Sequence, residues 1–222
     1  DSQRVKALWA HMGHDYFLRE DAADIAWHTE AILARTDSDT PVVLTKAAGS
    51  RFDPVTQIFI YMRDRDHLFA VITATMEQLG LNVHGARLYS SADHHTLDTF
   101  FVLEQDGRPV PPGGSRAAQI RSALTDQLTG TEHYLDVVQR HTPRALKYFT
   151  VPTETRLTTD PSGSHSILEV MTPDRAGLLA RIGRVFFAFG IKVRNARITT
   201  LGARVEDVFF ITDATHRPIE DP

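Results

Sequence analysis

The chain contains an internal repeat, and this feature constrains its fold more than any other. Residues 57–110 align with residues 167–219 at a shift of about 110 positions. The identities keep their order through both copies: Asp64–Arg65 with Asp174–Arg175, Leu68 with Leu178, Gly80 with Gly190, Ala86–Arg87 with Ala196–Arg197 and, after a one-residue slip, Asp98, Phe100, Phe101 and Pro109 with Asp207, Phe209, Phe210 and Pro218. Such a repeat predicts two copies of one supersecondary unit.

Each repeat is predicted to fold as strand, helix, strand, strand. Short apolar runs rich in β-branched and aromatic residues predict strands over 58–62 and 167–171. In the second repeat, apolar residues at helical spacing follow Gly177 and stop at Gly190, a typical C-terminal end of a helix. Residues 191–200 and 205–212 then predict a hairpin.

The first repeat is predicted to continue into a second helix over 115–129, with Ser115 as its N-cap, and a last strand over 149–157. The order βαββαβ is that of the α+β ferredoxin-like plait, in which two helices cover one face of an antiparallel sheet. Because the second repeat stops at Pro222, before its second helix, we expect that unit to be incomplete.

Three parts follow from this pattern. We expect a helical extension over 1–40, the first repeat unit over 53–160 and the second over 161–222. In the extension, Val5, Leu8 and Trp9 predict one short helix, and Asp21 is a candidate cap for another.

Composition excludes several classes of function. The 222 residues include no cysteine, so disulfides, thiolate nucleophiles and thiolate metal sites are excluded. The formal net charge is −4, which gives no basic surface for a nucleic acid. No apolar run approaches the roughly 20 residues of a membrane span. We expect a cytoplasmic protein with neither nucleic-acid nor membrane partners.

The residues from Asp174 to Leu179 are the strongest candidate for a binding site. They lie between a strand and the start of a helix, where backbone N–H groups and the positive helix end suit a carboxylate. Asp174 could hold an ammonium group, so the turn suits a zwitterion. In the alternative interpretation, Gly177 only permits the turn and Asp174 only caps the helix. The first repeat has Asp64 but carries His67 where the second has Gly177, which makes its turn the weaker candidate.

The repeated βαββ unit with its turn Asp174-Arg175-Ala176-Gly177-Leu178-Leu179 resembles the ACT domain, a regulatory module that binds small molecules, most often amino acids. A wider set of motifs resembles the C-terminal part of the bifunctional uridylyltransferase and uridylyl-removing enzymes that act on the PII signal protein. These motifs are residues 16–19, 25–29, 81–84, 97–100 and 196–200 with Glu206–Asp207. Their order and spacing carry the resemblance.

That resemblance implies a glutamine-sensing region of an enzyme that adds uridylyl groups to PII and removes them. The nucleotidyltransferase signature and the full set of ligands of an HD hydrolase site are absent from this sequence. We therefore expect no catalytic residue and no cofactor in this chain, and Mg²⁺ only for the catalytic domains of the parent enzyme. The implied partners are L-glutamine, PII, the enzyme's own catalytic domains and, through the ACT units, a second copy of the chain.

The resemblance also implies where the ligand lies. ACT ligands usually sit between paired units, one supplying the strand-to-helix turn and the other the edge of its second strand. The candidate residues are therefore Asp174, Arg175, Gly177, Leu178 and Leu179, with Asn195 and Arg194, and from the first repeat Asp64, His67, Asn82 and His84. For the strand residues the alternative is an exposed hairpin edge with no ligand.

Other interpretations stay open. His14–Asp15 has the letters of an HD dyad, but one dyad without further ligands does not predict a metal centre. The aromatic pairs Phe100–Phe101 and Phe209–Phe210 are expected to pack in the core rather than to stack on bases. As a different class of function, the repeats could form an interaction or oligomerisation module without a ligand.

Overall fold

The computed structural model describes residues 2–37, 39–50, 53–130, 153–175, 177–201 and 204–219. Within these residues, no helix is long and apolar enough to cross a membrane.

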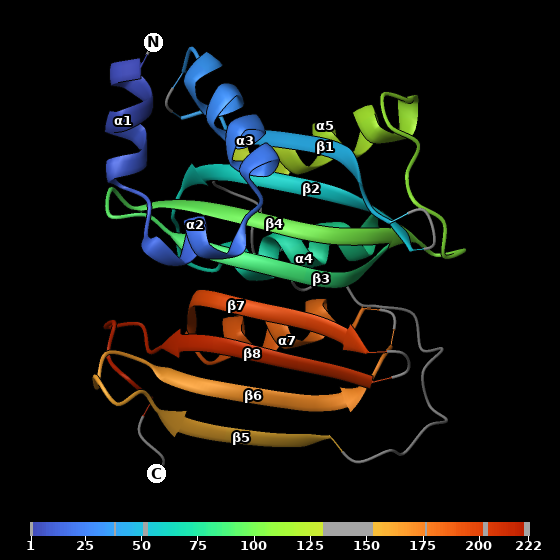
Figure 1. The fold of residues 1–222 in the computed structure, drawn as a ribbon. Helices are drawn as coiled ribbons and strands as arrows, with labels where there is room; N and C mark the ends of the chain where they lie inside the picture. Colours follow the sequence, from blue (N-terminus) through green and yellow to red (C-terminus); the bar gives the residue numbers. More distant parts are fainter. Residues whose placement is uncertain are drawn as a thin grey trace.

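Strands of both repeats form one antiparallel sheet in the order β1-β2-β4-β3-β7-β8-β6-β5 (Figure 1). The strands are β1 (Val42–Gly49), β2 (Pro54–Arg63), β3 (Leu81–Ser90), β4 (His95–Glu104), β5 (Glu154–Thr159), β6 (Ser166–Pro173), β7 (Lys192–Leu201) and β8 (Arg204–Thr212). The helices are α1 (Ser2–Ala10), α2 (His14–Arg19), α3 (Ala22–Ala34), α4 (Leu68–Gln78), α5 (Ser115–Thr129) and α7 (Leu178–Ala188). The two ferredoxin-like units in tandem and the helical extension are thereby confirmed.

The two repeats join at the centre of the sheet, where β3 pairs with β7. The register runs from Gly85 opposite Thr199 to Leu88 opposite Ala196. Within it, Arg87 lies opposite Arg197, and these two residues are equivalent in the repeat. The pairing therefore places a pseudo-twofold axis at the middle of the joint, and the two halves of the molecule are related by it.

The outer strand of each half precedes the repeat that it completes. β1 pairs with β2, and β5 pairs with β6, each as an antiparallel neighbour. The strand expected over 149–157 as the end of the first unit is therefore wrong: its described part belongs to β5, which extends the second half. Residues 149–152 lie outside the described residues. The first half instead takes its edge from β1, which the sequence pattern did not predict.

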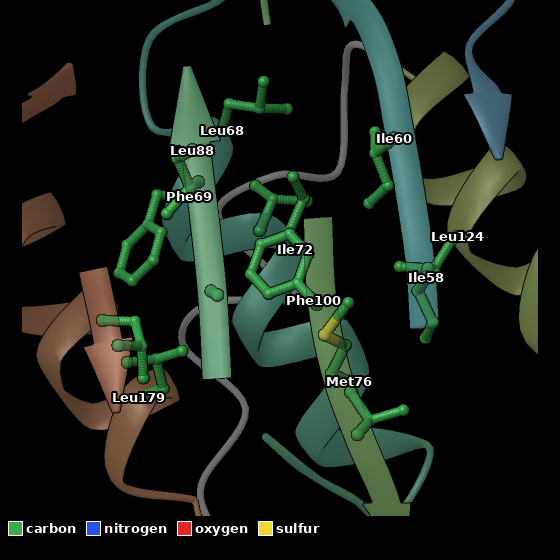
Figure 2. Close-up of a cluster of buried hydrophobic side chains, with 14 of the residues drawn as sticks. Ile58, Ile60, Leu68, Phe69, Ile72, Met76, Leu88, Phe100, Leu124 and Leu179 are labelled. Carbon is green, nitrogen blue, oxygen red and sulfur yellow. The ribbon is translucent and has the colours of Figure 1, made fainter. Parts of the chain in front are cut away.

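One hydrophobic core runs through both halves on the face that α4, α5 and α7 cover. Every residue of α4 from Leu68 to Met76 is buried, because the sheet, α5 and α7 surround it. Leu179 of α7 joins the side chains of the first half (Figure 2). Of the aromatic pairs expected in the core, Phe100 and Phe209 are fully buried in it, whereas their neighbours Phe101 and Phe210 are only partly buried.

The helical extension covers the opposite face of the first half (Figure 1). The buried ring of His28 stacks on Phe59 of β2, with 3.6 Å between the ring centroids. Burial lowers the pKa of His28 to about 4, so the ring is neutral, and its Nδ1 is hydrogen-bonded to the Tyr16 hydroxyl at 2.9 Å. The buried Glu20 accepts hydrogen bonds from Arg87 (3.0 Å) and from the hydroxyl of Tyr89 (3.1 Å). These contacts fix the extension to β2 and β3.

Two details of the helix ends differ from expectation. The N-cap of α5 is Gly114, and Ser115 is its first helical residue. Asp21 does hold the N-cap position of α3, but its side chain makes no capping hydrogen bond. In both cases, the backbone geometry rather than a side-chain cap defines the start of the helix.

Helices α4 and α7 approach closely because Gly183 has no side chain. A Cβ atom at Gly183 would lie 2.8 Å from Oγ1 of Thr73 and 3.0 Å from Cα of Ala70. The second contact is with backbone, so it cannot be relieved by a side-chain rotation. The glycine therefore sets the spacing of the two helices that carry the repeat junction.

We expect Gly183→Ala to lower the free energy of unfolding. Overpacking costs about 1–3 kcal/mol, which exceeds the gain of about 1 kcal/mol from the better helix propensity of alanine. Urea unfolding measures the difference. Val185→Ala on the same helix is the control, since Val185 is 52% exposed and should change stability little. A Gly183→Ala variant as stable as the wild type would contradict the close contact.

Candidate functional site

Two cavities lie where the repeats meet, and the pseudo-twofold axis relates them. In each, the strand-to-helix turn of one repeat faces the second strand of the other. The turn-2 cavity, of about 110 Å³, combines Thr73, Glu77, Asn82 and His84 of the first repeat with Asp174, Arg175, Gly177, Leu178, Leu179 and Asp207 of the second. The turn-1 cavity, of about 520 Å³, combines Asp64, Asp66 and His67 with Phe187, Lys192 and His216.

The turn-2 cavity unites most of the residues expected to form a site. All the described turn candidates from Asp174 to Leu179 line it, and Asn82 and His84 face them from β3. Asp64 and His67 line the turn-1 cavity instead. Arg194 and Asn195 line neither cavity. Burial raises the pKa of Asp64, and the charge of Arg194 is close enough to oppose this rise slightly. The expected set therefore separates into two sites.

Gly177 gives the turn of the second repeat its shape. Its φ is 73°, in the left-handed region that favours glycine, and it is the N-cap of α7. No side chain hydrogen-bonds at this cap, so the capping role considered for Asp174 is not observed. Asp174 is left facing the cavity.

Glu77 of α4 reaches across the repeat junction to this turn. A Cβ atom at Gly177 would lie 2.2 Å from Oε1 of Glu77. The other carboxylate oxygen, Oε2, accepts a hydrogen bond from Arg184 of α7 at 2.9 Å. Sequence reasoning missed Glu77 because it lies on a largely apolar helix outside the repeated turn motif.

Asp207 of β8 is a second residue that sequence reasoning did not assign to the site. It is 1% exposed. Its Oδ1 accepts a long hydrogen bond of 3.3 Å from the backbone N–H of Thr199, while Oδ2 has no partner among the described residues. Burial, with a smaller contribution from the nearby charge of Asp174, raises the pKa of Asp207 to about 7. Its match to Asp98 in the repeat was the available signal.

The turn-1 cavity has different chemistry. His67 takes the place of Gly177 and has a φ of 66°, in the same left-handed region. Its ring packs against Phe187, which is the repeat equivalent of Glu77, with 4.5 Å between the centroids. Lys192, the equivalent of Asn82, forms an ion pair of 2.8 Å with Asp66. At this turn the charge of Asp66 is thus paired within the protein, while the buried Nδ1 of His67 has no hydrogen-bond partner among the described residues.

The described residues include no group of three His, Asp or Glu side chains that could hold a metal ion. His14 and Asp15 begin α2 in the extension, away from both cavities. The walls of the turn-2 cavity carry three carboxyl groups, from Glu77, Asp174 and Asp207, which suit binding by charge and hydrogen bonds.

We expect Asp207→Asn to stabilise the fold in a pH-dependent manner. Because the folded state holds this proton up to about pH 7, it binds more protons than the unfolded state between about pH 4 and pH 7. Stability conferred by the protonated carboxyl is therefore lost as the pH rises through this window. The gain from asparagine should be small at pH 4 and reach on the order of 2–4 kcal/mol above pH 8.

Urea unfolding at a series of pH values measures this gain. Glu206→Gln, at the neighbouring exposed position, is the control and should show no such trend. Parallel stability curves for the wild type and Asp207→Asn would mean that Asp207 is ionised throughout the range.

Comparison with known proteins gives matches over the whole chain. Residues 1–31 match the family described as the uridylyltransferase GlnD fifth domain, and residues 166–220 match the ACT domain. Bifunctional uridylyltransferase/uridylyl-removing enzymes from Stutzerimonas stutzeri (strain A1501) and Pseudomonas putida (strain F1) are 47% and 48% identical to it. A third, from Pseudomonas aeruginosa (strain LESB58), is 47% identical.

Each of these alignments covers 100% of this chain and 25% of the relative, so the chain spans about a quarter of the length of the enzymes it matches. No significant match to a solved structure was found. The expected resemblance is confirmed: over its whole length, this chain is similar to an ACT-containing quarter of the bifunctional uridylyltransferase/uridylyl-removing enzymes.

Proposed function

We propose that this chain is the glutamine-sensing region of an enzyme that uridylylates PII and removes the uridylyl group. The observation that carries the proposal is the turn-2 cavity, where the turn of one repeat and the second strand of the other enclose one space. The names of the relatives support the parent activity, and the ACT match supports a small-molecule ligand. L-Glutamine is the ligand we propose.

The chemistry of the turn-2 cavity suits a zwitterion with an amide side chain. Carboxylates attract the ligand's ammonium group, and Arg175 with the amino-terminal end of α7 attracts its carboxylate. The amide of Asn82 can both donate to and accept from a ligand amide. The cavity thus offers a partner for each polar group of glutamine.

Ligand binding can reach the rest of the enzyme through β3. One end of this strand carries Asn82 and His84 at the cavity, and the other carries Arg87 and Tyr89, which hold Glu20 of the extension. A ligand that favours one arrangement of the repeats shifts the extension with them. Allosteric coupling of this kind typically amounts to about 1–3 kcal/mol.

A second candidate function is an interaction module that binds no ligand. The observation in its favour is a pair of exposed apolar side chains, Val185 on α7 and Phe189 at its C-terminal cap, which are 52% and 77% exposed. Such a surface suits a protein contact. A ligand-free module should show no glutamine response at all.

Calorimetry with L-glutamine tests the proposal, and Gly177→Ala locates the site. We expect the wild type to bind, and Gly177→Ala to weaken binding at least 10-fold, because its Cβ displaces Glu77 and narrows the cavity. Gly163→Ala is the matched control: its φ is 67°, but no atom lies within 4 Å of the new Cβ. It therefore reproduces the backbone strain without the contact.

No heat and no thermal stabilisation of the folded wild type by millimolar L-glutamine would overturn the proposal and favour the interaction module. Equal weakening of binding by Gly177→Ala and Gly163→Ala would place the ligand elsewhere.

A further inference from the structure

The repeat supplies an internal comparison for Asp207. Its equivalent in the first half is Asp98 of β4, which is also buried, at 2% exposure, and also lies near its own turn aspartate, Asp64. Both carboxyls face the helix-covered side of the sheet, because directly opposite residues of an antiparallel pair lie on the same face and each carboxyl is opposite a core residue: Asp98 is opposite Ile60, and Asp207 is opposite Val170. The two halves thus begin from the same arrangement.

The two halves differ in which donors hydrogen-bond to the buried carboxyl group. In the first half, Thr96 lies two residues before Asp98 on the same face of β4, and its hydroxyl donates a hydrogen bond to Asp98 Oδ1. In the second half, the equivalent position is Val205, which has no donor and lines the turn-2 cavity. Oδ2 of Asp207 consequently has no donor among the described residues, and Asp207 itself lines the cavity.

A buried carboxyl oxygen without a donor is costly, because burial removes the water that would otherwise solvate it. The cost is recovered when a ligand brings the missing donor. An ammonium group provides three N–H donors and a positive charge, and Asp174 stands near enough to share it. Asp98 offers no such free place for a donor, since the hydroxyl of Thr96, the equivalent of Val205, already donates to its carboxyl group.

We propose that Asp207, together with Asp174, receives the ammonium group of the ligand in the turn-2 cavity, and that valine at position 205 keeps this carboxylate available. The inference rests on the proposed function, since it names the recognition element of that same site. This proposal also places amino-acid binding in the turn-2 cavity and not in the turn-1 cavity.

Binding should release a proton. The groups around Asp207 are Asp174 and Arg175 at the turn, His84 on β3, and Glu77 on α4 with its partner Arg184 on α7. The pKa of Asp207 is raised to about 7, so near neutral pH the empty cavity holds about half a proton there. An incoming ammonium favours the ionised carboxylate, so affinity should increase from pH 6 to pH 8.

Calorimetry tests this with two ligands and three variants. The ligands are L-glutamine and glutaramic acid, which lacks only the α-amino group. We expect Asp207→Asn and Val205→Thr each to weaken glutamine binding at least 10-fold, the second because the new hydroxyl donates to Asp207 as Thr96 does to Asp98. Asp98→Asn is the matched control and should leave binding unchanged. Glutaramic acid should bind the wild type and Asp207→Asn equally weakly.

A measurement on the wild type alone accompanies the variants. In buffers of different ionisation enthalpy at pH 7, the heat of glutamine binding should reveal release of about half a proton. Glutamine binding with unchanged affinity in Asp207→Asn, or without proton release in the wild type, would overturn this inference while leaving the proposed function in place. A wild type that binds no glutamine would overturn the proposed function itself.

Discussion

The antiparallel pairing of β3 with β7 is the interaction on which the rest of the structure depends. By joining the second strand of one repeat to that of the other, it makes a single sheet from two plaits and brings α4 against α7. Each strand-to-helix turn then faces the second strand of the opposite repeat. Both cavities are consequences of this joint, so neither repeat could build its site alone.

The sequence pattern predicted the elements with strong periodicity and missed those without it. The central strands and α7 follow from apolar spacing that recurs in the other repeat, and α5 follows from its own apolar spacing. Of the edge strands, β1 was missed and β5 was partly predicted but assigned to the wrong unit, and there is a physical reason: all six residues of β5 are exposed, so no buried face marks it. β1 has one buried residue, Val43, and its pairing with β2 comes from the hairpin rather than from an alternating pattern.

The site was predictable where it rests on the repeat and unpredictable where it rests on packing between repeats. Asp174 and Gly177 stand in a motif, and the pairing of repeats placed Asn82 and His84 opposite them. Glu77 enters the site only because α4 packs on α7, a contact that no local pattern encodes. The two cavities share one arrangement but carry different side chains at equivalent positions. In the turn-2 cavity Glu77 lies next to Gly177, and in the turn-1 cavity Phe187 packs against the ring of His67.

The opposition of Arg87 and Arg197 at the centre of the joint has a consequence for the whole molecule. Like charges directly opposite each other in an antiparallel pair destabilise it. Here Glu20, brought in by the helical extension, neutralises Arg87 at 3.0 Å. The extension therefore supplies the negative charge that offsets Arg87 at the repeat junction. Pulling it away would leave two guanidinium groups repelling each other across the central strands, so any movement of the upstream helices changes how firmly the two halves hold together.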